Sequence, residues 1–284
     1  MQRKTSCAGS TATAVIFALF VVLLTILTVY YFAIKLWWFP DPINEIGREI
    51  DRQFYRTLVI TGLVFVLSQL ALAWVVVRYR DRGQRAHYSH GVGWMEITWT
   101  LATIILFIGL GVYAQFTWAK IHLDPPGPDP VEVEVIGEQF KWSFRYPGPD
   151  GKFGRYKPLE QVKRERAAGR RSDPWQLDPA DPAGQDDIVL GPGSLMAVPA
   201  NRQVQIILRS KDVIHSFFVR ELRLKQDAVP GMVVPLRFTA EKPGDYELYC
   251  TELCGMGHHQ MRTVLKVLSQ ADYEQWLRGQ TATE

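Results

Sequence analysis

The chain has 284 residues, of which 47% are hydrophobic and 21% charged, and its 32 basic residues nearly balance 29 acidic ones. This apolar content excludes a disordered polymer, and three cysteines are too few for a small disulfide-stabilised scaffold. A formal net charge of +3 gives no electrostatic case for binding nucleic acid. The mean hydropathy of −0.05 is typical of a soluble protein, but an average does not show where the apolar residues lie.

Three long segments without charged residues lie in the first 120 residues and begin at Thr5, Thr57 and Ile97. The second segment has 21 residues, and as an α-helix it would span about 31 Å, the thickness of a bilayer core. Helices in the core of a soluble protein seldom reach such a charge-free length. We therefore expect transmembrane helices near 12–36, 57–77 and 97–119, within a helical region of residues 1–120.

The first apolar segment has a second interpretation as a cleaved secretory signal, because the basic sequence MQRK precedes it. It is longer than the about 7–15 apolar residues of a signal peptide, and no A-x-A site closes it. We therefore expect three crossings, or two if the first segment is cleaved. The basic segments MQRK and RYRDRGQRAHYSH indicate the cytoplasmic side. The chain after Lys120 then lies in the periplasm, and we expect a multi-pass protein of the bacterial inner membrane.

Residues 121–284 show the alternation of apolar and polar residues that is typical of β-strands. Seven segments carry it: VEVEV, QFKWSFRY, VQIIL, HSFFV, VVPLRF, YELYC and RTVLKVL. They predict an all-β exterior domain built as an antiparallel sandwich, with a short helix at SQADYEQWLRG. The stretch 147–192 is rich in Gly, Pro and charge and includes the basic run Lys163–Arg171. We expect it to be a solvated insertion between strands.

The last third of the chain carries a group of potential metal ligands. His215 lies in DVIHSFF, and Cys250, Cys254, His258 and Met261 follow within CTELCGMGHHQM. Thiolate, imidazole and thioether groups together point to copper. Two cysteines and two histidines would also suit structural zinc, which has no use for the methionine. A single blue-copper ion needs one cysteine, so the second favours two coppers bridged by both thiolates. A disulfide between the two cysteines and a copper chaperone are the remaining alternatives.

The segments DVIHSFFV, KQDAVPG and CTELCGMGHHQM resemble subunit II of the haem-copper cytochrome c oxidases. The resemblance implies a cupredoxin-like sandwich that carries the dinuclear copper centre CuA. It implies that Cys250 and Cys254 are bridging thiolates, that His215 and Met261 complete one copper, and that His258 and the backbone carbonyl of Glu252 complete the other. The Glu252 side chain would bind Mg²⁺ or Mn²⁺ shared with the catalytic subunit. His259 lies outside the family pattern.

The same resemblance implies a function in the respiratory chain. Electrons would arrive from a c-type cytochrome, pass through CuA, and reach a haem of catalytic subunit I, where oxygen is reduced to water and protons are pumped. Two alternatives stay open: the CuA subunit of a membrane nitric oxide reductase, and a membrane-anchored copper-delivery protein.

Three further residues are candidates by resemblance. Glu96, at the start of the third apolar segment, resembles the family's glutamate at the mouth of a proton-uptake path, although an acidic residue at a helix start is also favourable with the helix dipole. In GEQFKWSFRY, Phe140 stands where the family has the tryptophan that receives electrons, while Trp142 is retained. We therefore expect electrons to arrive through Phe140 or Trp142, from a donor that is tethered to the membrane or held in a supercomplex.

Overall fold

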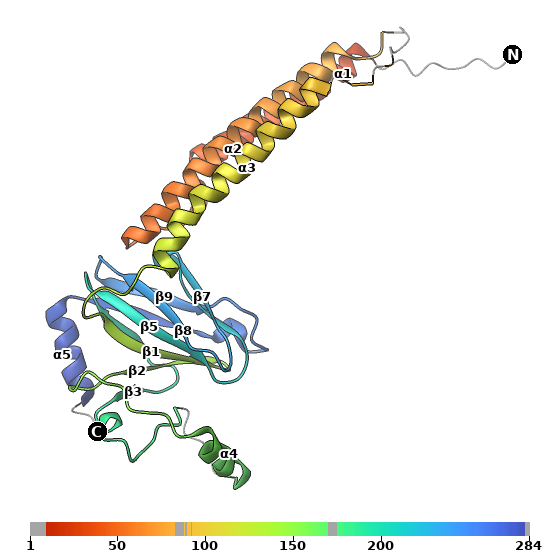
Figure 1. Ribbon diagram of the computed structural model, residues 1–284. Helices are drawn as coiled ribbons and strands as arrows, with labels where there is room; N and C mark the ends of the chain where they lie inside the picture. Colours follow the sequence, from red (N-terminus) through yellow and green to blue (C-terminus); the bar gives the residue numbers. More distant parts are fainter. Residues whose placement is uncertain (1–9, 83–87, 89, 92, 170–174, 282–284) are drawn as a thin grey trace. The chain divides into compact units, whose positions relative to one another are not determined.

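The computed structural model describes residues 10–82, 88, 90–91, 93–169 and 175–281. Its N-terminal part contains three helices that are long and apolar enough to cross a membrane: α1 (Thr11–Ala33), α2 (Glu45–Arg78) and α3 (Gly93–His122) (Figure 1). The three expected spans are confirmed. Helix α2 begins at Glu45 rather than near residue 57, because the mixed-charge segment before the apolar run also favours a helix and places Glu45 in its first turn.

The described chain divides into two compact units. The helical unit comprises Met1–Phe39 and Asp51–Trp118, and the second unit comprises Pro40–Ile50 and Ala119–Glu284. The second unit contains two five-stranded sheets with the orders β3-β2-β1-β5-β8 and β4-β10-β9-β6-β7. Their strands are β1 (Val131–Glu138), β2 (Lys141–Tyr146), β3 (Ile188–Leu190), β4 (Met196–Pro199), β5 (Gln203–Ser210), β6 (His215–Val219), β7 (Leu224–Ala228), β8 (Val234–Thr239), β9 (Gly244–Cys250) and β10 (Arg262–Leu268).

All seven alternating segments form strands, and the expected sandwich is confirmed. Its expected antiparallel character is wrong at two places, because β1 pairs with β5 and β10 pairs with β4 in parallel. Parallel neighbours require a long crossover connection. The residues between β2 and β5 provide one crossover, and the chain from β5 to β9 provides the other.

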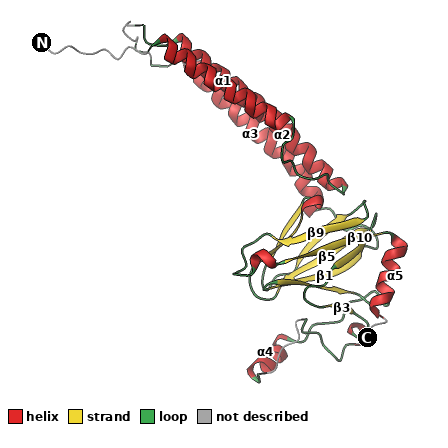
Figure 2. Ribbon diagram, turned by 180° about the vertical axis from the view of Figure 1, so that it is seen from behind, coloured by secondary structure: helices red, strands yellow, loops and turns green. Residues whose placement is uncertain are grey.

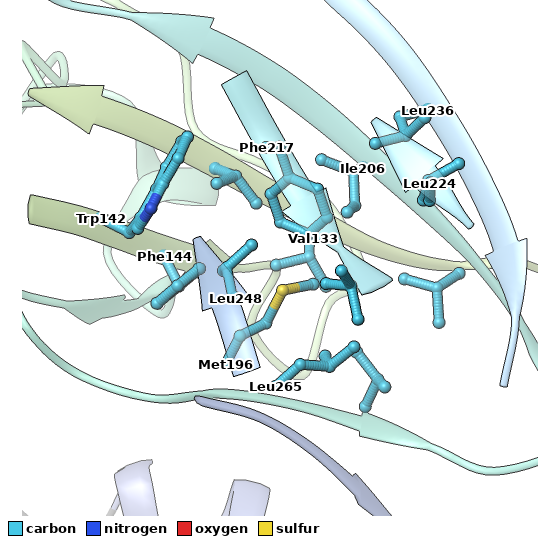
Figure 3. Packing of buried hydrophobic residues seen from close by; sticks show 14 of the residues in the cluster. Val133, Trp142, Phe144, Met196, Ile206, Phe217, Leu224, Leu236, Leu248 and Leu265 are labelled. Atoms are coloured by element: carbon cyan, nitrogen blue, oxygen red, sulfur yellow. The ribbon is translucent and has the colours of Figure 1, made fainter. Parts of the chain in front are cut away.

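The core of the sandwich lies between the two sheets (Figure 3). Trp142, Phe144 and Ile206 point inward from the first sheet, and Phe217 and Leu248 meet them from the second. The side chains of strand β5 alternate between buried and partly exposed, as expected for a strand with one face on the core. Helix α5 (Gln270–Thr281) forms at the predicted terminal segment and packs beside the sandwich (Figure 2).

The composition of the insertion between β2 and β4 predicts a solvated segment, but part of the insertion is buried. It contains α4 (Leu159–Ala167), which lies beyond the β3 side of the sandwich in Figure 1, and it buries Val162 and Trp175. It also closes over a buried charged group, the arginine cluster, which consists of Glu134, Arg145, Tyr156, Asp187 and Arg209.

Arg145 on β2 is the centre of the arginine cluster and is fully buried. Its Nη1 donates to Glu134 on β1 over 3.0 Å, its Nε donates to Asp187 over 3.0 Å, and its Nη2 donates to the carbonyl of Gly154 over 2.6 Å. The last two partners belong to the insertion, so hydrogen bonds to a buried charge tie the insertion to the sheet. Composition did not reveal this, because Arg145 and Asp187 are far apart in sequence.

Candidate metal site

The candidate ligands come from neighbouring strand ends of the second sheet. His215 is the first residue of β6 and Cys250 is the last residue of β9, and these two strands pair with each other. Residues 250–261, called here the ligand loop, connect β9 to β10. The loop is closed at its base because the Cys250 N–H donates to the Met261 carbonyl over 3.0 Å. The pairing therefore brings the distant His215 beside the loop.

The side chains of the candidate ligands converge on one another. Cys250 Sγ lies 3.8 Å from His215 Nδ1, 3.9 Å from Cys254 Sγ and 3.2 Å from the backbone oxygen of Glu252. Cys254 Sγ lies 3.5 Å from His258 Nδ1 and 3.8 Å from Met261 Sδ. The ligand atoms of His215, Cys250 and Cys254 all lie within 4.8 Å of one another. We call this group the ligand cluster.

The two thiols of the ligand cluster are free, because a disulfide would require an S–S distance of about 2.05 Å. Burial raises the pKa of Cys250, but hydrogen bonds involving His215 and the backbone outweigh it and lower that pKa to about 6. Burial and the neighbouring Cys250 raise the pKa of Cys254 to about 11. Cys250 is therefore the more acidic of the two thiols, and a bound cation would favour loss of the proton from both.

The chemistry of these donors suits a soft metal ion. Cys250, Cys254 and Met261 are buried and continuous with the apolar core, and His215 is fully buried. Thiolate, thioether and imidazole donors in a site of this kind favour copper over magnesium or calcium, which take oxygen ligands. The donor set therefore fits copper.

Sequence reasoning missed two residues that contact the ligand cluster. Asp212 Oδ1 lies 2.8 Å from His215 Nε2, the ring nitrogen that faces away from Cys250. Gln139 donates through its side-chain Nε2 to the Cys254 carbonyl over 2.6 Å and through its backbone N–H to Asp212 over 2.7 Å. The signal for Asp212 was its place three residues before His215. Gln139 carries no such signal.

The two aromatic candidates lie at different depths beside the ligand cluster. Trp142 is 1% exposed, and its ring packs edge-on against the His215 ring at a centroid distance of 6.1 Å. Phe140 is half-buried, and its ring fills the space that a Cβ atom would need at Gly255 and Gly257. Of these two aromatic candidates, Phe140 is thus the one that is partly accessible.

The other candidates lie apart from the convergent side chains or contact them through the backbone alone. Glu252 is half-buried and contributes its backbone oxygen. His259 is exposed, with its ring beside Gln260. Glu96 lies in the first turn of α3, in the helical unit, whereas the ligand cluster belongs to the second unit. Cys7 lies outside the described residues.

The chain is similar to cytochrome c oxidase subunits along most of its length. The family described as "Cytochrome C oxidase subunit II, periplasmic domain" matches residues 175–268. The alternative cytochrome c oxidase subunit 2 of Bradyrhizobium diazoefficiens is 35% identical over 269 residues, which cover 93% of this chain and 91% of that protein. Cytochrome c oxidase subunit 2 of Cereibacter sphaeroides is 31% identical over 228 residues, which cover 78% and 72%.

Among solved structures, the periplasmic domain of subunit II of cytochrome oxidase from Bradyrhizobium japonicum is 26% identical, with a TM-score of 0.38, and covers 55% of this chain and 96% of that one. The relatives from Bradyrhizobium diazoefficiens and Cereibacter sphaeroides show the family of this chain, because they are 35% and 31% identical to it and match most of the length of both chains. The chain therefore belongs to the cytochrome c oxidase subunit II family, as a membrane-anchored subunit of a haem-copper oxidase that associates with other oxidase subunits and has a periplasmic C-terminal domain.

Proposed function

We propose that this subunit accepts electrons from a c-type cytochrome at a dinuclear copper centre, CuA, and passes them to a haem of the catalytic subunit, where oxygen is reduced to water and protons are pumped. The observation that carries the proposal is the convergence of two thiols, two imidazoles and a thioether in the ligand cluster. The residues that would hold the copper ions are His215, Cys250, Glu252 through its carbonyl, Cys254, His258 and Met261.

The chain's contribution would be to bridge, bury and immobilise the centre. Cys250 and Cys254 would hold the copper ions through their thiolates, and the burial of both side chains would exclude water from the site. His215 and Cys250 belong to paired strands, so their backbones move little. When bound, the copper pair would supply one-electron transfer with the unpaired electron shared by both ions.

The positions of the aromatic residues support a route for electrons from the donor. Phe140 is partly accessible and packs on the ligand loop, so we propose that the donor docks over it. Trp142 would form the inner wall behind His215, because it is too deeply buried to touch a donor. Replacement of Phe140 by Ala is expected to slow reduction of the subunit by its donor. An unchanged rate would reject this route.

The donor itself is proposed to be a c-type haem subunit that is tethered to the membrane or held in a supercomplex. The support is the departure at Phe140, where the family has the electron-accepting tryptophan. Stopped-flow oxidation of soluble cytochrome c over a series of salt concentrations tests this idea. Fast oxidation with a steep salt dependence would contradict it, because such a dependence marks electrostatic steering of a free partner.

Two further roles belong to the proposal. Glu252 would bind Mg²⁺ or Mn²⁺ together with the catalytic subunit. Its replacement by Gln is expected to remove the manganese hyperfine lines from the spectrum of oxidase purified from cells grown with manganese.

Glu96, in the first turn of α3, would admit protons from the cytoplasmic side of the bacterial inner membrane. Replacement of Glu96 by Ala is expected to slow turnover without changing copper absorption. Unchanged turnover would reject the proton role.

Copper loading of the full-length chain in detergent tests the central proposal. The expected product contains two coppers per chain and gives the electron paramagnetic resonance spectrum of one electron shared by two copper nuclei. A spectrum of a single copper ion, or tighter retention of one zinc, would reject the dinuclear centre. The haem types of the catalytic subunit that co-purifies would then separate an oxidase from a nitric oxide reductase.

A further inference from the structure

We propose that the end of β1 and the turn that follows it, residues 137–140, form a clasp that holds the metal ligands in place, with Gln139 as its positioning residue. The clasp belongs to the first sheet of the sandwich, whereas the ligand loop and His215 belong to the second. It therefore joins the two sheets at the end where the ligands converge. This inference rests on the proposed function for the identity of the metal, but its contacts involve the protein alone.

Gln139 contacts both sides of the ligand cluster. Its side-chain Nε2 donates to the carbonyl of Cys254 over 2.6 Å, which fixes the backbone that carries one thiol. Its backbone N–H donates to Asp212 Oδ2 over 2.7 Å. Asp212 in turn holds His215 Nε2 through its other oxygen over 2.8 Å. Gln139 is thus linked directly to the backbone of Cys254 and, through Asp212, to the imidazole of His215.

Asp212 determines which nitrogen of His215 faces the thiols. In the neutral imidazole, the form that binds a metal, a carboxylate that accepts the Nε2–H leaves the lone pair on Nδ1, and Nδ1 is the nitrogen that lies beside Cys250. Outer partners of this kind orient metal-binding histidines in many proteins. Because Asp212 also accepts from the backbone N–H of Val213 over 2.7 Å, its carboxylate has little freedom to rotate. Gln139 and Val213 therefore fix the Asp212 carboxylate, which in turn orients the His215 ring.

Glycines allow the clasp to approach the ligands closely. A Cβ atom at Gly137 would lie 3.0 Å from the His215 ring and 3.1 Å from the Trp142 ring, so the backbone of β1 forms the floor beneath the imidazole. A Cβ atom at Gly257 would lie 2.3 Å from Cδ2 of Phe140. The Phe140 ring therefore rests directly on the backbone of the ligand loop. Polar contacts and packing act on the same loop from the same turn.

A purely architectural role is the competing explanation, and the chain offers a matched control for it. Gln203 also makes a side-chain hydrogen bond to a backbone group, accepting from the Gly127 N–H over 2.6 Å. Neither residue belongs to the clasp or the ligand loop. Replacement of Gln203 by Ala also removes one hydrogen bond between a glutamine side chain and the backbone, here one that the side chain accepts, and it leaves the clasp and the ligand loop unchanged.

The first test uses the full-length chain without metal and measures how fast a maleimide alkylates Cys254, identified by mass spectrometry. The Gln139→Ala change is expected to increase the rate up to about tenfold, because loss of the hydrogen bond that fixes the backbone of Cys254 lets the loop open more often, and one net hydrogen bond corresponds to a factor of up to about ten. Gln139→Glu keeps the shape but loses the donor, and it is expected to behave like Gln139→Ala. The rate in Gln203→Ala is expected to equal that of the wild type. Equal rates in Gln139→Ala and Gln203→Ala would overturn the clasp.

The second test uses copper and reads the geometry of the site. Gln139→Ala is expected to weaken copper binding about ten- to a hundredfold and to change the copper hyperfine splitting and the reduction potential. Unchanged affinity, splitting and potential would also overturn the clasp. If the wild-type chain itself lacks the dinuclear copper signal, the proposed function fails, while the alkylation rates still decide the clasp.

A size exchange supplies an internal check. Gly257 has a φ of −90°, which any residue adopts, so Gly257→Ala affects the site only through the displaced Phe140 ring. This variant is expected to change the copper spectrum. Addition of Phe140→Ala makes room for the new methyl group and is expected to restore the spectrum. A double variant that remains as altered as Gly257→Ala would contradict contact between the clasp and the ligand loop.

Discussion

The periplasmic domain contains two buried polar clusters of opposite character. In the arginine cluster two arginines face two carboxylates, and Arg145 donates to Glu134, to Asp187 and to a backbone carbonyl. The ligand cluster contains thiols, imidazoles and a thioether. In the described part of the chain, none of the hydrogen bonds and ion pairs of its side chains involves Lys or Arg.

This difference distinguishes a cluster that stabilises the fold from a cluster that can bind a metal ion. A buried charge must be compensated, and in the arginine cluster the chain itself provides the opposite charge. The ligand cluster gathers thiol, thioether and imidazole donors, and hydrogen bonds involving His215 lower the pKa of Cys250. An external positive ion would take up the lone pairs of these donors, and the proposed copper centre would provide that ion.

The largest effect is expected from removing a thiolate of the ligand cluster. Cys250→Ser and Cys254→Ser are each expected to weaken copper binding by more than about a hundredfold, because even outer partners of ligands are worth about ten- to a hundredfold. Copper stoichiometry and the electron paramagnetic resonance spectrum measure the loss. His259→Ala is the control, since His259 is exposed and its ring contacts Gln260. A serine variant that keeps the dinuclear spectrum would remove the thiolate bridge from the proposal.

In the arginine cluster, the largest effect is expected from Arg145→Met. It leaves two buried carboxylates without their central partner and should lower the free energy of unfolding by about 3–5 kcal/mol. Urea unfolding of the full-length chain in detergent, followed by tryptophan fluorescence, measures this change. A triple replacement with Glu134→Leu and Asp187→Leu should cost less than Arg145→Met alone. If the triple replacement cost more, the carboxylates would have a role beyond balancing Arg145.

A smaller effect is expected from Tyr156→Phe, which removes a hydrogen bond donated to Glu134 in the same cluster. The loss should be about 1.5–3 kcal/mol, the value of a hydrogen bond to a charged group. Burial, followed by the nearby Glu134 charge, raises the pKa of Tyr156 well above its usual value of about 10. The stabilising contribution is therefore complete below pH 10 and declines as the pH rises further, because the unfolded chain ionises first. The variant should show a shallower alkaline decline, and equal slopes would contradict the assignment.

The smallest effect is expected on the exposed side of the insertion. Lys163 Nζ and Glu160 Oε1 form a pair at 2.9 Å on α4, with side-chain exposures of 60% and 72%. Glu160→Gln should change the free energy of unfolding by at most about 0.5 kcal/mol, since solvent screens exposed pairs. The same urea experiment applies. A loss of several kcal/mol would show that α4 packs more tightly than its exposure indicates.

Features that depend on residues close together in the sequence were predicted correctly, whereas features that depend on residues far apart in the sequence were missed. Charge-free length alone predicts α1, α2 and α3, because a bilayer requires this property within each helix. Alternation predicts seven of the ten strands, but β3, β4 and β7 were not recognised, since β3 and β4 are short and the segment LKQDA of β7 reads as polar. The parallel pairing of β1 with β5 was also missed, because it depends on which strands become neighbours.

The sequence alone specified the three apolar spans and the metal-binding chemistry of residues 250–261, because helix hydropathy and a short ligand loop are local properties. Only the tertiary structure decided that the insertion would be fastened through Arg145 and that Gln139 would link His215 to Cys254. Each of these contacts joins residues that are remote in the chain and become neighbours when the sheets pack. Their hydrogen bonds require the distances of a packed domain, which no local pattern of residues encodes.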